Sequence, residues 1–237
     1  MMEEQVDRLV KKTWAKFLST PTTARLMIAI SGIPGSGKTS LAGIMARRIN
    51  ELYAQKFPGS PPVAIFVPMD GYHLTRAQLA AMPDPAFAAA RRGAAFTFDP
   101  EKFLRLVKRL REDLGPATQT IFAPSFDHAV KDPVEDDIPI LATSRVIFFE
   151  GNYLSLDKEP WNTAASLMDE LWFVEVDFET ARHRLIKRHV EAGIAKDAEE
   201  ADKRARENDL VNGSEIVNHR MPIQEVIISK DDATWER

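Results

Sequence analysis

The chain has 237 residues, of which 44% are hydrophobic and 28% are charged, so we expect one globular domain, residues 1–237, with its own buried core. The formal net charge of −4 argues against nucleic acid as a partner, because the field of the whole molecule repels a phosphate backbone. The absence of cysteine excludes disulfides, thiolate zinc sites and cysteine nucleophiles.

The first residues predict an amphipathic helix over 1–20. Its apolar residues recur at helical spacing: Val6, Leu9, Val10, Trp14, Phe17 and Leu18. The acids in this stretch argue against a secretory or mitochondrial presequence, and no apolar run in the chain is long enough to span a bilayer. We therefore expect a cytoplasmic protein without a membrane partner.

Apolar runs that alternate with helical patterns describe the rest of the chain. The predicted strands are residues 24–31, 63–70, 118–124, 144–151, 169–177 and 225–229. The predicted helices are residues 38–53, 98–113 (with Asp99 as N-cap), 178–193 and 197–220, the last as a helix pair or one bent helix. Residues 71–98 read as short surface helices and 127–139 as a polar loop. Unbroken apolar strands between helices indicate an α/β fold, a doubly wound and mainly parallel sheet with helices on both faces.

A glycine-rich turn joins the first strand to the helix that follows. Residues 32–39 read GIPGSGKT and match G-x-x-x-x-G-K-[ST] at every position. Glycines let backbone N–H groups curl around phosphate, and the helix adds the positive end of its dipole. The pattern predicts a site for ATP and Mg²⁺, in which Lys38 reaches the β- and γ-phosphates and the Thr39 hydroxyl ligates the metal; a chance loop is the alternative. The predicted ATP-binding residues are Gly32, Ile33, Pro34, Gly35, Ser36, Gly37, Lys38, Thr39 and Ser40.

Two carboxylates end predicted strands, where ligands of open parallel sheets bind. Asp70 could accept the proton of an attacking hydroxyl, and its alternative role is to cap the next turn. Glu150 could reach Mg²⁺ directly or through water, and its alternative is a solvent-facing strand end. The chain has no N-K-x-D segment for guanine and is short for an ATPase motor, which favours a kinase.

Several segments together resemble the superfamily of uridine kinase, phosphoribulokinase and pantothenate kinase. They are GIPGSGKTSLA, MDGYHL, RRGAAFTFD, PSFDHAVKDP, VIFFEGNYLSLD and LWFVEVDFETARHRLIKRH. The segments EGNYL and RHVEAG are especially similar to those of a branch of bacterial and fungal small-molecule kinases. The resemblance covers nearly the whole chain from Leu26 on. It implies a P-loop NTPase fold with an acceptor-side insertion at 71–98 and a helical lid with C-terminal helices at 182–218.

The resemblance also implies roles for single residues. Asp70 matches the catalytic aspartate, Glu150 the glutamate on the magnesium side, and Arg188 a lid arginine that meets the developing charge. The acceptor-binding residues that it suggests, together with two residues placed beside Asp70 by the sequence, are Tyr72, His73, Arg92, Asp99, His128 and Asn208.

These acceptor-side residues have structural alternatives. Asp99 already serves as a helix N-cap, His128 could be a solvated loop residue, and Arg92 could belong to a surface pair. Tyr72 and His73 could be packing residues.

The helix at 178–193 carries a cationic face of Arg184, Lys187 and Arg188, which could neutralise charge during phosphoryl transfer or simply face solvent. Uridine kinases continue into further arginines where this chain has Gly193 and Ile194, so uridine specificity is not implied.

The sequence thus predicts an ATP-dependent kinase that transfers the γ-phosphoryl group to a hydroxyl of a small metabolite. Nucleoside, pantothenate-like and sugar-like acceptors stay open. An ATP-binding regulator or scaffold without phosphotransfer is the alternative, and a nucleic-acid-acting ATPase is disfavoured. A homodimer is a further expectation.

Overall fold

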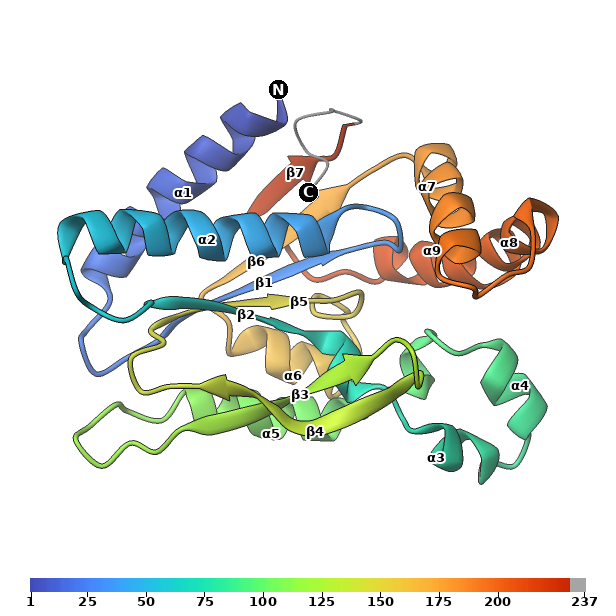
Figure 1. Cartoon of the computed structure of the whole chain (residues 1–237), viewed down its shortest axis with the longest axis horizontal. Helices are drawn as coiled ribbons and strands as arrows, with labels where there is room; N and C mark the ends of the chain where they lie inside the picture. Colours follow the sequence, from blue (N-terminus) through green and yellow to red (C-terminus); the bar gives the residue numbers. More distant parts are fainter. Residues whose placement is uncertain (231–237) are drawn as a thin grey trace.

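A five-stranded parallel sheet forms the centre of the structure, a computed structural model that describes residues 1–230 (Figure 1). The strand order is β2-β5-β1-β6-β7. The bounds of the strands are β1 (Leu26–Gly32), β2 (Ala64–Pro68), β5 (Val146–Glu150), β6 (Glu170–Glu175) and β7 (Glu225–Ile228). The predicted α/β class and parallel sheet are confirmed.

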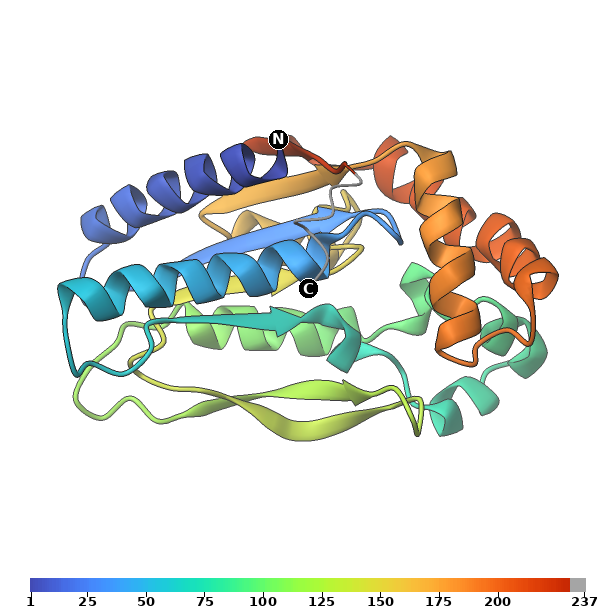
Figure 2. The ribbon, with the colours of Figure 1, turned by 45° about the horizontal axis from the view of Figure 1, so that its top comes forward.

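Helices cover both faces of this sheet, as Figure 2 shows. α1 (Met2–Ser19) and α2 (Lys38–Lys56) pack against one face, and α5 (Pro100–Leu110) and α6 (Trp161–Ser166) pack against the other. Side chains of β1 alternate between the two layers, because successive residues of a strand point to opposite faces. Ile28 and Ile30 join the core under α1 and α2, whereas Met27 and Ala29 join the core under α5 and α6. No helix in residues 1–230 is both long and apolar enough to cross a membrane.

Helix α5 begins as its sequence predicts. The Asp99 side chain accepts a hydrogen bond of 2.8 Å from the backbone N–H of Lys102, and Pro100 occupies the first turn. The residues expected on its apolar face are all buried: Phe103, Leu104, Val107 and Leu110.

The prediction of a polar loop at residues 127–139 was wrong. This segment contains most of β4 (Asp132–Ile140), which pairs with β3 (Ile121–Asp127) as a separate antiparallel hairpin outside the main sheet. Most of β4 faces solvent, so its sequence carries prolines and acids in place of an apolar alternation. The hairpin packs closely on the turn after β2, where a Cβ on Gly71 would lie 2.1 Å from the Pro124 carbonyl oxygen.

Two groups of helices face each other beyond the carboxyl ends of β1 and β5 (Figure 1). The segment expected as an acceptor-side insertion, residues 71–98, contains the end of the 3₁₀ turn η1 (Met69–Tyr72), the short helices α3 (Arg76–Ala80) and α4 (Pro85–Ala90) and the 3₁₀ turn η2 (Ala95–Thr97). We call this segment the insertion. The segment expected as a lid with C-terminal helices, residues 182–218, contains most of α7 (Phe178–Glu191), α8 (Ala198–Arg204), the π-helical turn η3 (Ala205–Asp209) and α9 (Leu210–Asn218). We call these helices the lid. The bent-helix alternative for 197–220 describes the last three of these elements.

Candidate functional site

The turn between β1 and α2 has a curled backbone. Gly35 and Gly37 have φ of 81° and 91°, a left-handed conformation that strains residues with a Cβ. A Cβ on Gly35 would also lie 2.8 Å from the carbonyl oxygen of Ala181 in α7, so the turn is held close to the lid. α2 begins at Lys38, and its unpaired N-terminal N–H groups therefore lie beside the turn. This is the backbone arrangement that binding of polyphosphate requires.

Lys38 and Glu150 are buried together at the floor of this turn. They are 8% and 6% exposed, and Lys38 Nζ lies 3.9 Å from Glu150 Oε1. The two residues meet because β1 and β5 are adjacent, with Ile30 paired to Glu150. Burial raises the pKa of Glu150 to about 7, although the Lys38 ammonium and the Thr39 hydroxyl both favour the ionised carboxylate. Burial likewise lowers the pKa of Lys38, against the attraction of Glu150.

The Thr39 hydroxyl lies close enough to Glu150 to favour its ionised carboxylate and lower its pKa, so the two residues offer neighbouring oxygen atoms beside the turn. No cluster of three or more His, Asp or Glu side chains within residues 1–230 could hold a metal without other ligands. Mg²⁺ at nucleotide sites takes one or two protein oxygens and completes its shell with phosphates and water. The donor set of Thr39 and Glu150 fits Mg²⁺ that arrives with a nucleotide.

Asp70 and Arg188 both lie near the pair of Lys38 and Glu150. Asp70 lies on η1, directly after the strand β2 that pairs with β5, and its side chain is 49% exposed. Arg188 lies on α7 and is exposed. Both are close enough to Glu150 for their charges to act on it, after the larger effects of burial and Lys38: Asp70 raises its pKa and Arg188 lowers it. The structure thus brings together four of the predicted catalytic and metal-binding side chains.

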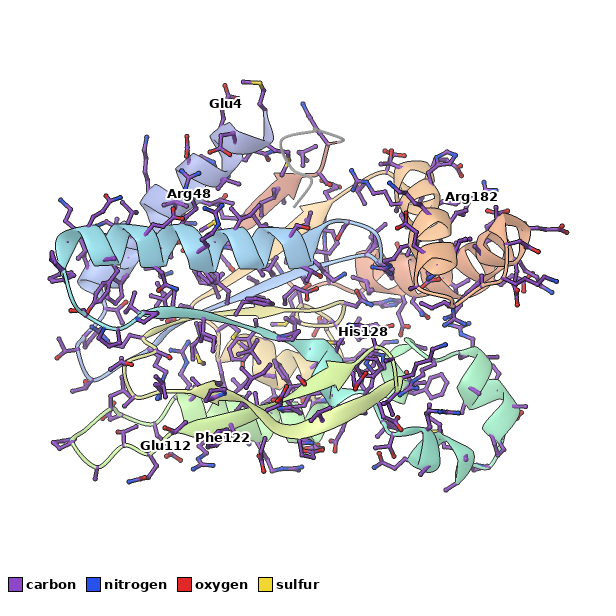
Figure 3. All side chains as sticks on the ribbon, viewed as in Figure 1. Glu4, Arg48, Glu112, Phe122, His128 and Arg182 are labelled. Atoms are coloured by element: carbon purple, nitrogen blue, oxygen red, sulfur yellow. The ribbon has the colours of Figure 1, made fainter. Side chains whose placement is uncertain are left out.

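Three of the predicted acceptor-side residues surround Phe126, a residue that the sequence analysis did not select. The His73 ring lies 4.9 Å from the Phe126 ring, the His128 ring lies 5.2 Å from it, and the Arg92 guanidinium lies over it at 5.5 Å. Figure 3 shows His128 at the end of β3 that faces the insertion and lid. Arg92 also donates hydrogen bonds to the Leu74 and Lys131 carbonyl oxygens, so it also joins the insertion to the hairpin.

The remaining acceptor-side predictions fall at different places. Tyr72 is buried in the core with its ring 5.2 Å from Phe103, and Asp99 caps α5, so the structure gives both residues a packing or capping role. Asn208 is buried in η3 and donates a 3.0 Å hydrogen bond to the Arg92 carbonyl oxygen, which links the lid helices to the insertion. Their contact with an acceptor stays a prediction.

The cationic face expected on α7 divides into separate roles. Arg184 donates hydrogen bonds to the Gly35 carbonyl oxygen at 3.1 Å and to Ser229 Oγ at 2.9 Å, so it ties the lid to the glycine-rich turn. Lys187 and Arg188 are exposed. The residue after Arg188, His189, is buried, and its Nε2 lies 2.9 Å from Asp209 Oδ2. This contact joins α7 to η3. Nothing local in the sequence indicates the contacts of Arg184 and His189, because their partners are 20 or more residues away.

The chain is similar to several curated kinases. It is 62% identical over 159 residues to "ATP-dependent kinase-like protein notR'" of Aspergillus versicolor, a match that covers 67% of this chain and 92% of the relative. It is 40% identical over 188 residues to a Schizosaccharomyces pombe protein that carries a uridine kinase name, covering 79% of this chain and 76% of that protein. No protein-family model matches the chain.

Solved structures share the fold. A Silicibacter sp. TM1040 protein, named for a fructose transport system kinase, superposes with a TM-score of 0.78 at 30% identity and covers 93% of this chain and 98% of its own. YFH7 of Saccharomyces cerevisiae superposes with a TM-score of 0.82 at 23% identity, covering 98% of this chain and 99% of its own.

Proposed function

Because the chain belongs to the family of uridine kinase-like, ATP-dependent P-loop kinases, we propose that it transfers the γ-phosphoryl group of ATP to a hydroxyl of a small metabolite. The observation that carries this proposal is the convergence of Lys38, Glu150, Asp70 and Arg188 beside one glycine-rich turn. An ammonium and a guanidinium there can stabilise the negative charge of phosphate groups, and an accessible carboxylate can accept a hydrogen bond from a hydroxyl.

Each group has a distinct part in this reaction. The backbone from Ile33 to Ser40 and the Lys38 ammonium hold the triphosphate, and Thr39 and Glu150 hold the magnesium that accompanies it. Magnesium supplies positive charge to the β- and γ-phosphates when it is bound. Asp70 orients the acceptor hydroxyl and takes its proton, and Arg188 stabilises the negative charge on the transferred group.

The accessibility of Asp70 supports its role as the base. Lys38 and Glu150 are buried and can contact only a ligand that enters the turn, whereas about half of the Asp70 side chain is exposed to solvent. A hydroxyl held at Asp70 would therefore meet the phosphate from the insertion side, where His73 and Phe126 lie. Positioning of the two reactants, without covalent chemistry by the protein, supplies most of the rate in phosphoryl transfer.

A screen for ADP release tests the proposal directly. Purified protein with ATP and Mg²⁺ is mixed with a library of hydroxyl-bearing metabolites, and nucleotide binding is measured in parallel by calorimetry. We expect ADP formation that depends on one chemical class of acceptor. Tight ATP binding with no acceptor-dependent ADP across the library would contradict the proposal and favour a regulator or scaffold that binds ATP.

A further inference from the structure

A cluster of two arginines and two amides lies where the insertion meets the lid. Its members are Arg91 on the insertion and Arg204, Asn208 and Asn212 on α8, η3 and α9, and we call it the Arg91–Arg204 cluster. Arg91 Nη2 donates a 2.6 Å hydrogen bond to Asn212 Oδ1, and Arg204 Nη2 lies 3.4 Å from the Arg92 carbonyl oxygen. Asn208 donates to that same carbonyl oxygen, and Asn212 Nδ2 lies 3.5 Å from Asn208 Oδ1, so hydrogen bonds connect the four side chains to one another and to the Arg92 carbonyl group.

The positive charge of this cluster has no carboxylate partner. Within residues 1–230, no Asp or Glu oxygen forms an ion pair with Arg91 or Arg204. The Nε atoms of both arginines are buried without a hydrogen-bond partner. Partial burial of two guanidinium groups without a counter-ion is costly, and natural proteins pair or solvate such charges.

Three carboxylates of the surrounding elements have other partners. Asp209 pairs with His189 at 2.9 Å, Glu215 pairs with Lys158 at 2.6 Å, and Asp132 receives Arg92 at 3.3 Å. These three carboxylates therefore form their ion pairs with residues other than Arg91 and Arg204. A guanidinium fork binds planar or tetrahedral anions through two parallel hydrogen bonds.

The cluster is connected to the reacting centre. Asp209 follows Asn208 in the π-helical turn and is close enough to Lys38 for its charge to act on the ammonium. Gly93, the residue after Arg92, has no side chain, and a Cβ there would lie 3.9 Å from Asn212 Nδ2 and 4.0 Å from Asn208 Nδ2. Tyr153 fixes this backbone by donating a 2.7 Å hydrogen bond to the Gly93 carbonyl oxygen. π-helical turns are frequent at functional sites.

We propose that the acceptor carries a carboxylate or a phosphate monoester besides its reacting hydroxyl, and that Arg91 and Arg204, with the Asn208 and Asn212 amides, bind this anionic group. The inference rests on the proposed kinase function and adds the class of its substrate. The acceptor hydroxyl oxygen attacks the γ-phosphorus, its proton passes to Asp70, and the bond from the γ-phosphorus to the bridging oxygen breaks to release ADP. The anionic group is bound throughout and is not altered.

Matched acceptors and matched variants test this inference. The acceptors are hydroxy acids against their amides and sugar phosphates against their parent sugars, so that the carboxylate and phosphate sources are separated. The variants are Arg91→Gln and Arg204→Gln, and Arg206→Gln is the control, because Arg206 is an exposed neighbour that pairs with Asp202. We expect anionic acceptors to be preferred in one of the two series. Each cluster variant should lower kcat/KM for them about 10- to 100-fold, the effect of losing a charge-assisted hydrogen bond, with the KM for ATP unchanged.

A binding measurement makes the result independent of turnover. Calorimetry with a nonhydrolysable ATP analogue and the same acceptors should show binding of the anionic members, weakened in Arg91→Gln and Arg204→Gln and unchanged in Arg206→Gln. Circular dichroism checks that the variants fold. Arg204→Lys keeps the positive charge without the guanidinium fork, so it should lose less affinity for the anionic acceptors than Arg204→Gln. Equal use of neutral acceptors, or equal losses on neutral and anionic ones, would overturn the inference and leave the cluster as a structural link. Binding of anionic compounds without ADP formation would overturn the kinase proposal alone.

Discussion

Glu150 combines burial with two favourable partners, and its ionisation should control nucleotide binding. Burial raises its pKa to about 7, against the stabilising effects of Lys38 and Thr39. Metal binding requires the deprotonated carboxylate, so protons and Mg²⁺ compete for the same oxygens. A group with a pKa near 7 is mostly ionised at pH 8 and mostly protonated at pH 6.

We expect the affinity for Mg²⁺·ATP to fall about tenfold from pH 8 to pH 6, because about a tenth of Glu150 is ionised at the lower pH. Calorimetric titrations across this range provide the measurement. The variant Glu150→Gln shows how much of the change comes from the phosphates of ATP itself. Identical pH dependence in the wild type and Glu150→Gln would show that Glu150 does not meet the metal.

Four of the residues that the sequence analysis identified share one property. Gly35, Lys38, Asp70 and Glu150 stand at the ends of strands or in the turn beside them, so a linear pattern already fixes their place. Phe126 and Arg91 were not identified, because their significance depends on contacts across the hairpin and the lid that no local spacing encodes.

At the scale of elements, the β3–β4 hairpin supports the turn that carries Asp70. The contact is backbone on backbone, since Gly71 approaches the Pro124 carbonyl oxygen with no room for a side chain. An element that supports the site in this way was missed in part by sequence analysis. Prolines and acids are typical of loops, and β4 tolerates them because it lies outside the main sheet and is largely exposed. The buried strands, by contrast, could be predicted from their continuous apolar runs.

We expect Gly71→Ala to displace the Asp70 turn from the hairpin, because its Cβ would meet Pro124 backbone at 2.1 Å. The loss of stability should be about 2 kcal/mol or more, with turnover reduced further than nucleotide affinity. Gly43→Ala in α2 is the control, since its Cβ would meet nothing within 4 Å. This variant should raise the free energy of unfolding by about 0.5–1 kcal/mol, because alanine favours the helix more than glycine does. Chemical denaturation measures both, and similar stability of the two variants would refute the proposed tight contact.

The whole molecule is a parallel sheet with a nucleotide turn at one end, and nucleotide should stabilise all of it. A ligand at 100 times its Kd adds about 2.7 kcal/mol to the free energy of unfolding. For a chain of this size, we expect Mg²⁺·ATP to raise Tm by about 5–10 °C. Lys38→Met should abolish this rise, and a rise that persists in Lys38→Met would place the nucleotide elsewhere.

Two expectations about partners also belong to this scale. The net charge of −4 predicts that oligonucleotides are not retained at physiological salt, which a filter-binding assay measures. The homodimer stays a prediction that sedimentation can test. The overall α/β class could be predicted because the strands of the main sheet are apolar runs and most helices carry a clear periodicity. The closure of the lid on the insertion could not, because it depends on hydrogen bonds between residues more than 100 positions apart.

The central claim is that Asp70 receives the proton of an acceptor hydroxyl beside ATP held by Lys38. The most direct measurement is acceptor-dependent ADP formation by the wild type and by Asp70→Asn, with ATP binding to both measured by calorimetry. Asn keeps the shape of the side chain and removes the base, so turnover should fall at least about 100-fold while ATP affinity stays within about twofold. Full turnover in Asp70→Asn would contradict the account.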